Sequence, residues 1–249
     1  MSEHMALENL TVLDLTRVLA GPFCTMMLAD MGANVIKIEV PKGGDDTRSY
    51  PPFRAKNLNG ERESVYFANI NRNKKGITLN LKAPEGKEIF KELVKKADIV
   101  VENYRPGVMD KLGLGYDVLK EINPRIIYAA VSGFGCYGPY HLRPGYDILA
   151  QAMGGMMSIT GSKGGEPTRA GSALGDILGG LHVTIGILAA VNARTITGKG
   201  QRVDVSLMDT KPSVRTPAPQ LGQNNRDIFE GVLGMTEEQF NALHEKQVF

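Results

Sequence analysis

Short, mostly apolar segments alternate along the chain with longer segments in which apolar residues recur at helical spacing. Residues 11–15 (TVLDL) and 34–39 (NVIKIE) have the character of buried strands, and residues 22–30 between them have the character of a helix. Pro22 is predicted as the first residue of this helix, and Gly32 as the signal that ends it. A strand, a helix and a second strand in this order predict two parallel strands.

The alternation continues to about residue 209. Because strands and helices follow one another throughout, the sequence predicts an α/β fold, a Rossmann-like and mostly parallel sheet with helices on both faces. The further helices are predicted at 83–97, 108–122 (one or two helices), 146–157 and 177–195, and the further strands at 98–103, 125–133 and 201–209.

Two polar stretches interrupt this pattern. Residues 41–63 are rich in Gly and Pro and predict a long surface loop, and loops of this length are often functional. Residues 211–221 contain three prolines and are typical of a linker, and the motif TEEQ at 236–239 predicts a capping box at the start of a small helical tail. We therefore expect a large domain, 1–210, followed by a C-terminal segment, 211–249.

The charge balance is nearly even, with 29 Lys and Arg residues against 27 Asp and Glu residues and a formal net charge of +2. This argues against a nucleic-acid-binding protein, which usually has a basic bias. The two cysteines, Cys24 and Cys136, form no CxxC pair or metal-ligand cluster, which favours a reducing, cytoplasmic location. We expect no signal peptide. The longest apolar stretch, 177–191, is interpreted as a buried helix, because roughly 20 residues are needed to span a bilayer.

A glycine-rich motif at 133–138 matches GxGxxG and follows a predicted strand. A dinucleotide-binding loop also needs a helix at its third glycine, but Pro139 and Pro144 follow, and position 158 is a serine instead of the expected acid. Glu39 ends a strand as the ribose-binding acid of Rossmann proteins does, but the preceding turn has a single glycine. The sequence therefore favours a glycine-rich loop beside a cleft over an NAD site.

Two loops carry concentrated positive charge. Residues 71–75 (NRNKK) place three cations in five positions and form either a solvated turn or a phosphate clamp. Residues 103–107 (NYRPG) follow a predicted strand at the carboxyl edge of the sheet, where ligands bind in open α/β folds. An aromatic ring next to an arginine at this edge suits an adenine ring and a phosphate.

Asp176 is the most informative carboxylate in the sequence. It ends the segment GSALGD, immediately before the long apolar helix. A helix N-terminus favours the ionised form, and an accessible carboxylate can be a nucleophile. The alternative is an N-cap aspartate, which is the commoner role at such a position. The four histidines form no competing catalytic set, and the GxSxG elbow of a hydrolase is absent from the sequence.

Five segments in the same order resemble the family III CoA-transferases. The resemblance extends from about Leu7 to Asp209 and resumes at Arg215. It implies that Asp176 is the covalent nucleophile, that acyl-CoA and a small carboxylic acid are the substrates, and that neither a metal nor a permanently bound cofactor is needed. The five segments are 13–39, 71–81, 101–119, 143–161 and 172–190.

The resemblance also implies a site for coenzyme A. The turn after the first strand would lie against the pantetheine arm, the loop at 103–107 would hold the adenosine end and its phosphates, and Tyr146 would lie near the thioester. Arg143 and Arg169 would flank the acyl site and hold the second carboxylate of a dicarboxylic acid, or else are solvated surface residues. The implied CoA contacts are Arg17, Val18, Leu19, Asn103, Tyr104, Lys111 and Tyr146, with Asn73 and Lys74 near the phosphates.

The chain departs from the family pattern at one informative position. The family includes α-methylacyl-CoA racemases, which use a His and an Asp as a proton-transfer pair, and the racemase His falls on Tyr146 here. A tyrosine, with an ordinary pKa near 10, is a poor base at neutral pH. The sequence therefore favours a transferase first, a non-catalytic CoA-binding remnant second and a racemase third.

A second departure concerns length. Members of the family contain a small second domain, and the sequence has no counterpart of it between residues 210 and 211. The chain is then either a shortened variant or part of a longer one. Members also form homodimers of interlocked rings, closed by a C-terminal segment that returns to the first domain. We expect 211–249 to pack on the large domain and a homodimer to form, interlocked only where the complete ring is present.

Overall fold

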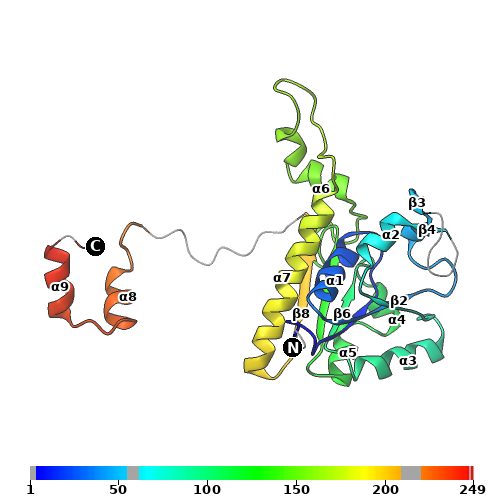
Figure 1. Ribbon diagram of the computed structural model, residues 1–249, viewed down its shortest axis with the longest axis horizontal. Helices are drawn as coiled ribbons and strands as arrows, with labels where there is room; N and C mark the ends of the chain where they lie inside the picture. The colour runs from blue at the N-terminus through cyan, green and yellow to red at the C-terminus, as the bar shows by residue number, and fades with distance from the viewer. Residues whose placement is uncertain (1–3, 55–61, 209–219, 247, 249) are drawn as a thin grey trace. The chain divides into compact units, whose positions relative to one another are not determined.

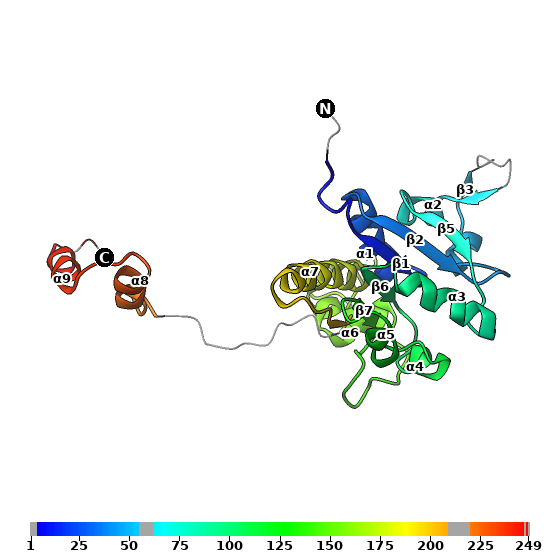
Figure 2. The same ribbon diagram turned by 90° about the horizontal axis from the view of Figure 1, so that it is seen from below.

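The computed structural model describes residues 4–54, 62–208, 220–246 and 248. The chain divides into two compact units, 1–210 and 211–249, and each is described by itself. The large unit has three layers, with one central sheet between two layers of helices (Figure 1, Figure 2).

The central sheet has six strands, and every pair of neighbouring strands is parallel. The strand order is β5-β2-β1-β6-β7-β8, with β1 and β6 in the middle. Because these two strands are parallel neighbours, their carboxyl ends lie side by side at the same edge of the sheet. The predicted parallel α/β fold is confirmed. The strands are β1 (Thr11–Asp14), β2 (Asn34–Glu39), β5 (Lys75–Thr78), β6 (Ile99–Glu102), β7 (Ile127–Ser132) and β8 (Arg202–Ser206).

Alternate residues of the strands supply two separate hydrophobic cores. On β6, Ile99 and Val101 face the core that contains helices α1 and α7, whereas Val100 faces the core that contains α3 and α5. Because successive side chains of a strand point to opposite faces, both layers of helices are anchored by the same strands. The helices of this unit are α1 (Ala20–Asp30), α2 (Val65–Ile70), α3 (Pro84–Val94), α4 (Val108–Leu112), α5 (Tyr116–Ile122), α6 (Asp147–Met153) and α7 (Leu174–Thr197).

Several predicted boundaries were wrong. Helix α1 begins two residues before Pro22, which still lies in the first turn, where backbone N–H groups have no partner within the helix. The predicted loop at 41–63 contains a 3-10 turn at Asp46–Ser49 and strand β3 (Phe53–Arg54), which pairs antiparallel with β4 (Glu63–Ser64). Residues 55–61 of that loop lie outside the described part of the chain.

Helix α7 is longer than the predicted span of 177–195 and has 24 residues. Within the described residues it is the one helix whose length and apolar composition would allow it to cross a membrane. However, Val183, Ile187 and Ala190 are fully buried against the strands and α1. One face of α7 is therefore buried in the core as predicted, whereas Ile185 and Ile196 on the helix are 62% and 82% exposed, so the helix is not buried on all sides.

The C-terminal unit contains two short helices, α8 (Asn225–Gly231) and α9 (Glu237–Glu245). The predicted capping box is confirmed: the Gln239 backbone N–H donates to Thr236 Oγ1 over 3.2 Å, and the Thr236 N–H donates to Gln239 Oε1 over 2.9 Å. The Phe229 and Phe240 rings, 6.3 Å apart, join α8 to α9. Most of the predicted linker lies outside the described residues, and docking of this unit on the large domain stays a prediction.

Candidate active site

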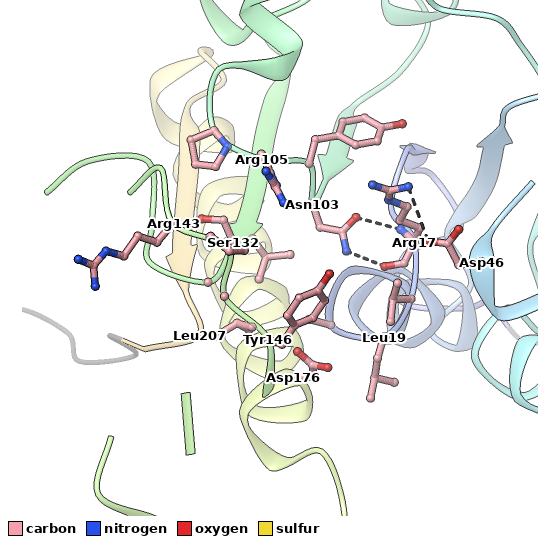
Figure 3. Close-up of a pocket in the computed structure, with 18 residues that line it drawn as sticks. Arg17, Leu19, Asp46, Asn103, Arg105, Ser132, Arg143, Tyr146, Asp176 and Leu207 are labelled. Atoms are coloured by element: carbon pink, nitrogen blue, oxygen red, sulfur yellow. Dashed lines mark hydrogen bonds and ion pairs between the residues drawn. The ribbon is translucent and has the colours of Figure 1, made fainter. Parts of the chain in front are cut away.

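A cavity of about 180 Å³ lies at the carboxyl ends of β1, β6 and β7. Ligands bind at this edge in open α/β sheets. Figure 3 shows Leu19, Tyr146 and Asp176 gathered at one end of the cavity. The cavity brings together seven of the ten predicted site residues: Arg17, Val18, Leu19, Asn103, Tyr104, Tyr146 and Asp176.

The glycine-rich loop after β7 brings Tyr146 to this cavity. Gly133 and Gly145 cross so closely that a Cβ atom on Gly133 would lie 2.3 Å from the Gly145 Cα atom. Only glycine allows this approach. No helix begins at Gly138, which has a φ of +89°. The loop therefore lacks the helix that a dinucleotide site needs, and the predicted glycine-rich loop beside a cleft is confirmed.

Asp176 is the third residue of α7 and does not cap that helix. The N-cap position is Ala173, whose side chain offers no hydrogen bond. Instead, the Asp147 carboxylate on α6 accepts from the Gly175 backbone N–H over 2.7 Å and from the Asp176 N–H over 3.4 Å. No described residue donates a hydrogen bond to the Asp176 carboxylate. The N-cap alternative is therefore wrong, and the Asp176 oxygens are available for chemistry.

A buried glutamine fixes this cap. Gln151 Nε2 donates to Asp147 Oδ2 over 2.7 Å, and Gln151 Oε1 accepts from the Ala170 backbone N–H over 2.8 Å. Gln151 and Asp147 are one helical turn apart on α6, and both are buried. This pair was not predicted, although an Asp and a Gln four residues apart beside Tyr146 give a local signal in the sequence.

The surroundings of Asp176 disfavour its charge. Burial first, and then the neighbouring Asp147 carboxylate, raise the pKa of Asp176 to about 6. Burial, followed by the charge of Asp176, also raises the pKa of Tyr66 on α2 to about 12. Asp176 is therefore mostly ionised at neutral pH and is more basic than an ordinary aspartate, and Tyr66 is a neutral hydroxyl whose surroundings include the Asp176 charge.

The turn between β1 and α1 forms one wall of the cavity. Asn103 holds this turn with two hydrogen bonds, accepting from the Arg17 N–H over 2.9 Å and donating to the Arg17 carbonyl over 2.6 Å (Figure 3). The Arg17 guanidinium lies 3.6 Å from Asp46 and 5.9 Å from the centre of the Tyr104 ring. Asn103 thus holds the wall in place, and its predicted contact with CoA stays a prediction.

Three predicted site residues do not line this cavity. The buried Lys74 Nζ donates to Asp14 Oδ2, the Pro22 carbonyl and Asn71 Oδ1 over 2.9–3.0 Å, which uses all three of its protons. Asn73 donates to Asp30 over 2.8 Å. Lys111 is exposed on α4. The segment 71–75 is therefore not a purely solvated turn, and its lysine at position 74 is bound to the protein core.

A second cavity of about 460 Å³ lies at the carboxyl ends of β2 and β5 and shares Tyr104 with the first. Its apolar wall includes Ile38 and Leu81, and Lys42 and Lys82 also line it. This cavity was not predicted from the sequence, because its residues come from three stretches that are far apart in the chain, 38–42, 79–82 and 104–112. Among the described residues, no group of three or more His, Cys, Asp and Glu side chains is arranged to hold a metal ion.

The comparisons agree on one family. The profile of CoA-transferase family III matches residues 7–236. The acetyl-CoA:oxalate CoA-transferase of Acetobacter aceti is 50% identical over 203 residues, which are 81% of this chain and 51% of that protein. The succinyl-CoA:glutarate CoA-transferase of Homo sapiens is 46% identical over 212 residues, which are 85% of this chain and 47% of that protein.

The fold agrees as well. The crystal structure of a CAIB/BAIF family protein from Brucella suis superposes with a TM-score of 0.80 and 45% identity, over 84% of this chain and 55% of that one. The chain thus spans about half the length of the relatives that it matches. The matched region contains the whole sheet, both cavities and Asp176, and on this evidence the chain belongs to CoA-transferase family III.

Proposed function

We propose that this protein transfers CoA from an acyl-CoA to a carboxylic acid through an aspartyl-CoA thioester on Asp176. The main support for this proposal is the environment of the Asp176 carboxylate. It lines the cavity, no described residue donates a hydrogen bond to it, and burial with Asp147 raises its pKa to about 6. Family membership supports the same reaction, although the chain covers only about half of its relatives.

The proposed reaction has two symmetrical halves. The Asp176 carboxylate attacks the donor thioester carbonyl, the C–S bond breaks, and a mixed anhydride and CoA thiolate form. The thiolate attacks the Asp176 carbonyl of the anhydride, which releases the donor acid and leaves an aspartyl-CoA thioester. The acceptor carboxylate attacks this thioester, and the released thiolate then attacks the acceptor carbonyl, which frees Asp176. One thioester replaces another, so the exchange is close to energetically balanced.

We place CoA across both cavities. The turn at Arg17–Leu19 would flank the pantetheine arm, and Tyr146 would lie beside the thioester. Tyr104 lines both cavities, so the adenosine end can pass it and enter the second one. That cavity combines an apolar wall with Lys42 and Lys82, which suits an adenine ring and phosphates. Lys111 lies on α4, whose Val108 and Leu112 line the same cavity, and its contact with phosphate stays a prediction.

The acceptor is proposed to be a dicarboxylic acid. The relatives named above act, by their names, on oxalate and glutarate, which are both dicarboxylates. Both arginines are exposed, but Arg143 lines the first cavity and Arg169 does not; the Arg143 guanidinium lies 4.1 Å from the centre of the Tyr140 ring. Arg143→Ala should therefore weaken transfer to dicarboxylates more than to monocarboxylates, and Arg169→Ala serves as the matched control. Equal loss for both acid classes would remove Arg143 from this role.

A second candidate is a CoA-binding protein without transferase activity, because the two cavities that would receive CoA are lined mostly by residues other than Asp176. Exchange of labelled CoA into an acyl-CoA, compared between wild type and Asp176→Asn, separates the two. Exchange by the wild type that is lost in Asp176→Asn supports the transferase. Tight CoA binding without exchange in either protein supports the second candidate. A racemase is not favoured, because Tyr146 occupies the position of its base.

Homodimer formation and a cytoplasmic location are also proposals. Light scattering on the purified chain tests the first, and fractionation of the source cells tests the second. An intact mass measured on the natural protein would show whether the family's small domain is present in it.

A further inference from the structure

The turn that walls the first cavity holds a valine in an unusual conformation. Val18 has a φ of +69°, in the left-handed region. Branched side chains rarely adopt this region, and such residues persist only where the surrounding structure fixes them. Val18 lines the cavity together with Asp176. Something in the fold must therefore hold this turn in place.

A buried ion pair behind the cavity wall does so. Asp45 Oδ1 accepts from the Val18 backbone N–H over 3.3 Å, and Asp45 Oδ2 accepts from Lys37 Nζ over 3.0 Å. Lys37 Nζ also donates to the Thr16 carbonyl over 2.9 Å. The two side chains are only 2% and 1% exposed. The pair thus binds the backbone at Thr16 and at Val18, on either side of Arg17.

Asp45 is itself fixed by its neighbours. Its backbone N–H donates to Glu39 Oε2 over 2.8 Å, and Glu39 is bound by the Arg48 guanidinium through two bonds of 2.6 and 2.7 Å. Thr47 donates to Asp45 Oδ1 from its backbone over 3.0 Å and from its hydroxyl over 2.8 Å. Asp45 therefore cannot turn away from Val18 without breaking several bonds.

A buried ion pair is weak evidence for a gain in stability, because desolvation offsets its attraction. Neither Lys37 nor Asp45 lines the first cavity, so neither is placed to touch the reacting atoms. Instead, the pair binds the backbone of the turn that forms the cavity wall, at Thr16 and Val18.

We propose that Lys37 and Asp45 are positioning residues that hold Val18 in its left-handed conformation and so set the cavity wall that faces Asp176. The inference rests on the proposed function, because the position of this wall affects a rate only if the reaction takes place at Asp176. Substrate held out of line by about 1 Å can react roughly 100-fold more slowly.

A double-mutant cycle of Asp45→Ala and Val18→Gly tests the proposal. Glycine adopts a positive φ without strain, so the turn needs less support in the Val18→Gly background. Asp45→Ala alone should lower kcat about 100-fold and raise the acyl-CoA KM by no more than about 10-fold, the loss expected where the same turn only loosens its hold on CoA. In the Val18→Gly background, Asp45→Ala should lower kcat by less than about 10-fold. Its effect on the unfolding temperature should also be smaller there than in the wild-type background.

Asp98→Asn is the matched control, because it removes another ion pair, 3.0 Å between Asp98 and Arg194, at the opposite ends of the strands. It should lower the unfolding temperature without changing kcat at a temperature where the protein is folded. Equal losses from Asp45→Ala in both backgrounds would overturn the inference while leaving the proposed function intact. If the wild type transfers no CoA, the proposed function fails. The same double-mutant cycle, measured by unfolding temperature, then decides whether Asp45 holds Val18: equal losses of unfolding temperature from Asp45→Ala in both backgrounds would show that it does not.

Discussion

Asp147 caps the helix that carries Asp176, and in doing so it places a second carboxylate beside the first. Its Oδ1 atom accepts from the Gly175 N–H over 2.7 Å and from the Asp176 N–H over 3.4 Å. One side chain thus has two effects. It anchors the first turn of α7, and its negative charge makes Asp176 harder to ionise.

The first prediction concerns the pH dependence of transfer. Asp176 must be ionised to attack, so the rate should rise with pH through about 6. Asp147→Asn keeps an oxygen for the Gly175 N–H but removes the like charge, which lowers the pKa of Asp176 and moves the rise to lower pH. The profile of kcat/KM against pH measures this shift. An unchanged midpoint would contradict the assigned effect of Asp147.

The second prediction concerns stability. The folded protein raises the pKa of Asp176 from 3.8 to about 6, so ionised Asp176 destabilises the fold at higher pH. Asp176→Asn should therefore be more stable than wild type by roughly 1–3 kcal/mol near pH 8, and this advantage should shrink as the pH falls through 6 toward 4. Urea unfolding of both proteins at several pH values measures it. An advantage that does not vary with pH would contradict the prediction.

The third prediction concerns the stability of the fold at acid pH. Burial opposes the ionised forms of Asp14 and Asp45, but the nearby lysines and hydroxyls outweigh it, so the pKa of each lies below its usual value. Their contribution to stability is complete above about pH 4–5 and is lost as the pH falls further, through the lowered values.

Asp45→Asn should therefore reduce stability at neutral pH and make the loss of stability below about pH 5 less steep. Asp117→Asn is the control, because Asp117 pairs with Lys120 on the exposed surface of α5, and surface pairs contribute little. The free energy of unfolding at neutral and acid pH compares the two variants. Equal behaviour of both would contradict the role assigned to the buried ion pair.

The fourth prediction concerns Asn103. Asn103→Ala removes both bonds to the Arg17 backbone, so the wall of the first cavity loosens, and CoA affinity should fall about 10-fold. Asn103→Asp keeps the acceptor for the Arg17 N–H but sets a carboxylate oxygen against the Arg17 carbonyl, so it should not recover the lost affinity. Calorimetric titration with CoA measures both variants. Equal affinity in all three proteins would show that the wall does not depend on these bonds.

Features that depend on neighbouring residues were predictable from the sequence. The buried strands and the capping box at Thr236 were found because their signals lie within a few residues. The 71–75 segment was ambiguous, because the partner of Lys74 is Asp14, sixty positions earlier. The start of α7 was placed too late, because its cap is supplied by Asp147 from another helix. Strand β5 is not among the predicted strands, since its four residues are exposed and lack a buried pattern.

The two hydrogen bonds of Asn103 link distant parts of the site. Asn103 is adjacent in sequence to Tyr104, and Tyr104 lines both cavities, while its neighbour grips the turn that walls only the first. Because one peptide bond joins Asn103 to Tyr104, the short segment that separates the two cavities is also the segment that holds the Arg17 backbone, and the walls of both cavities depend on it.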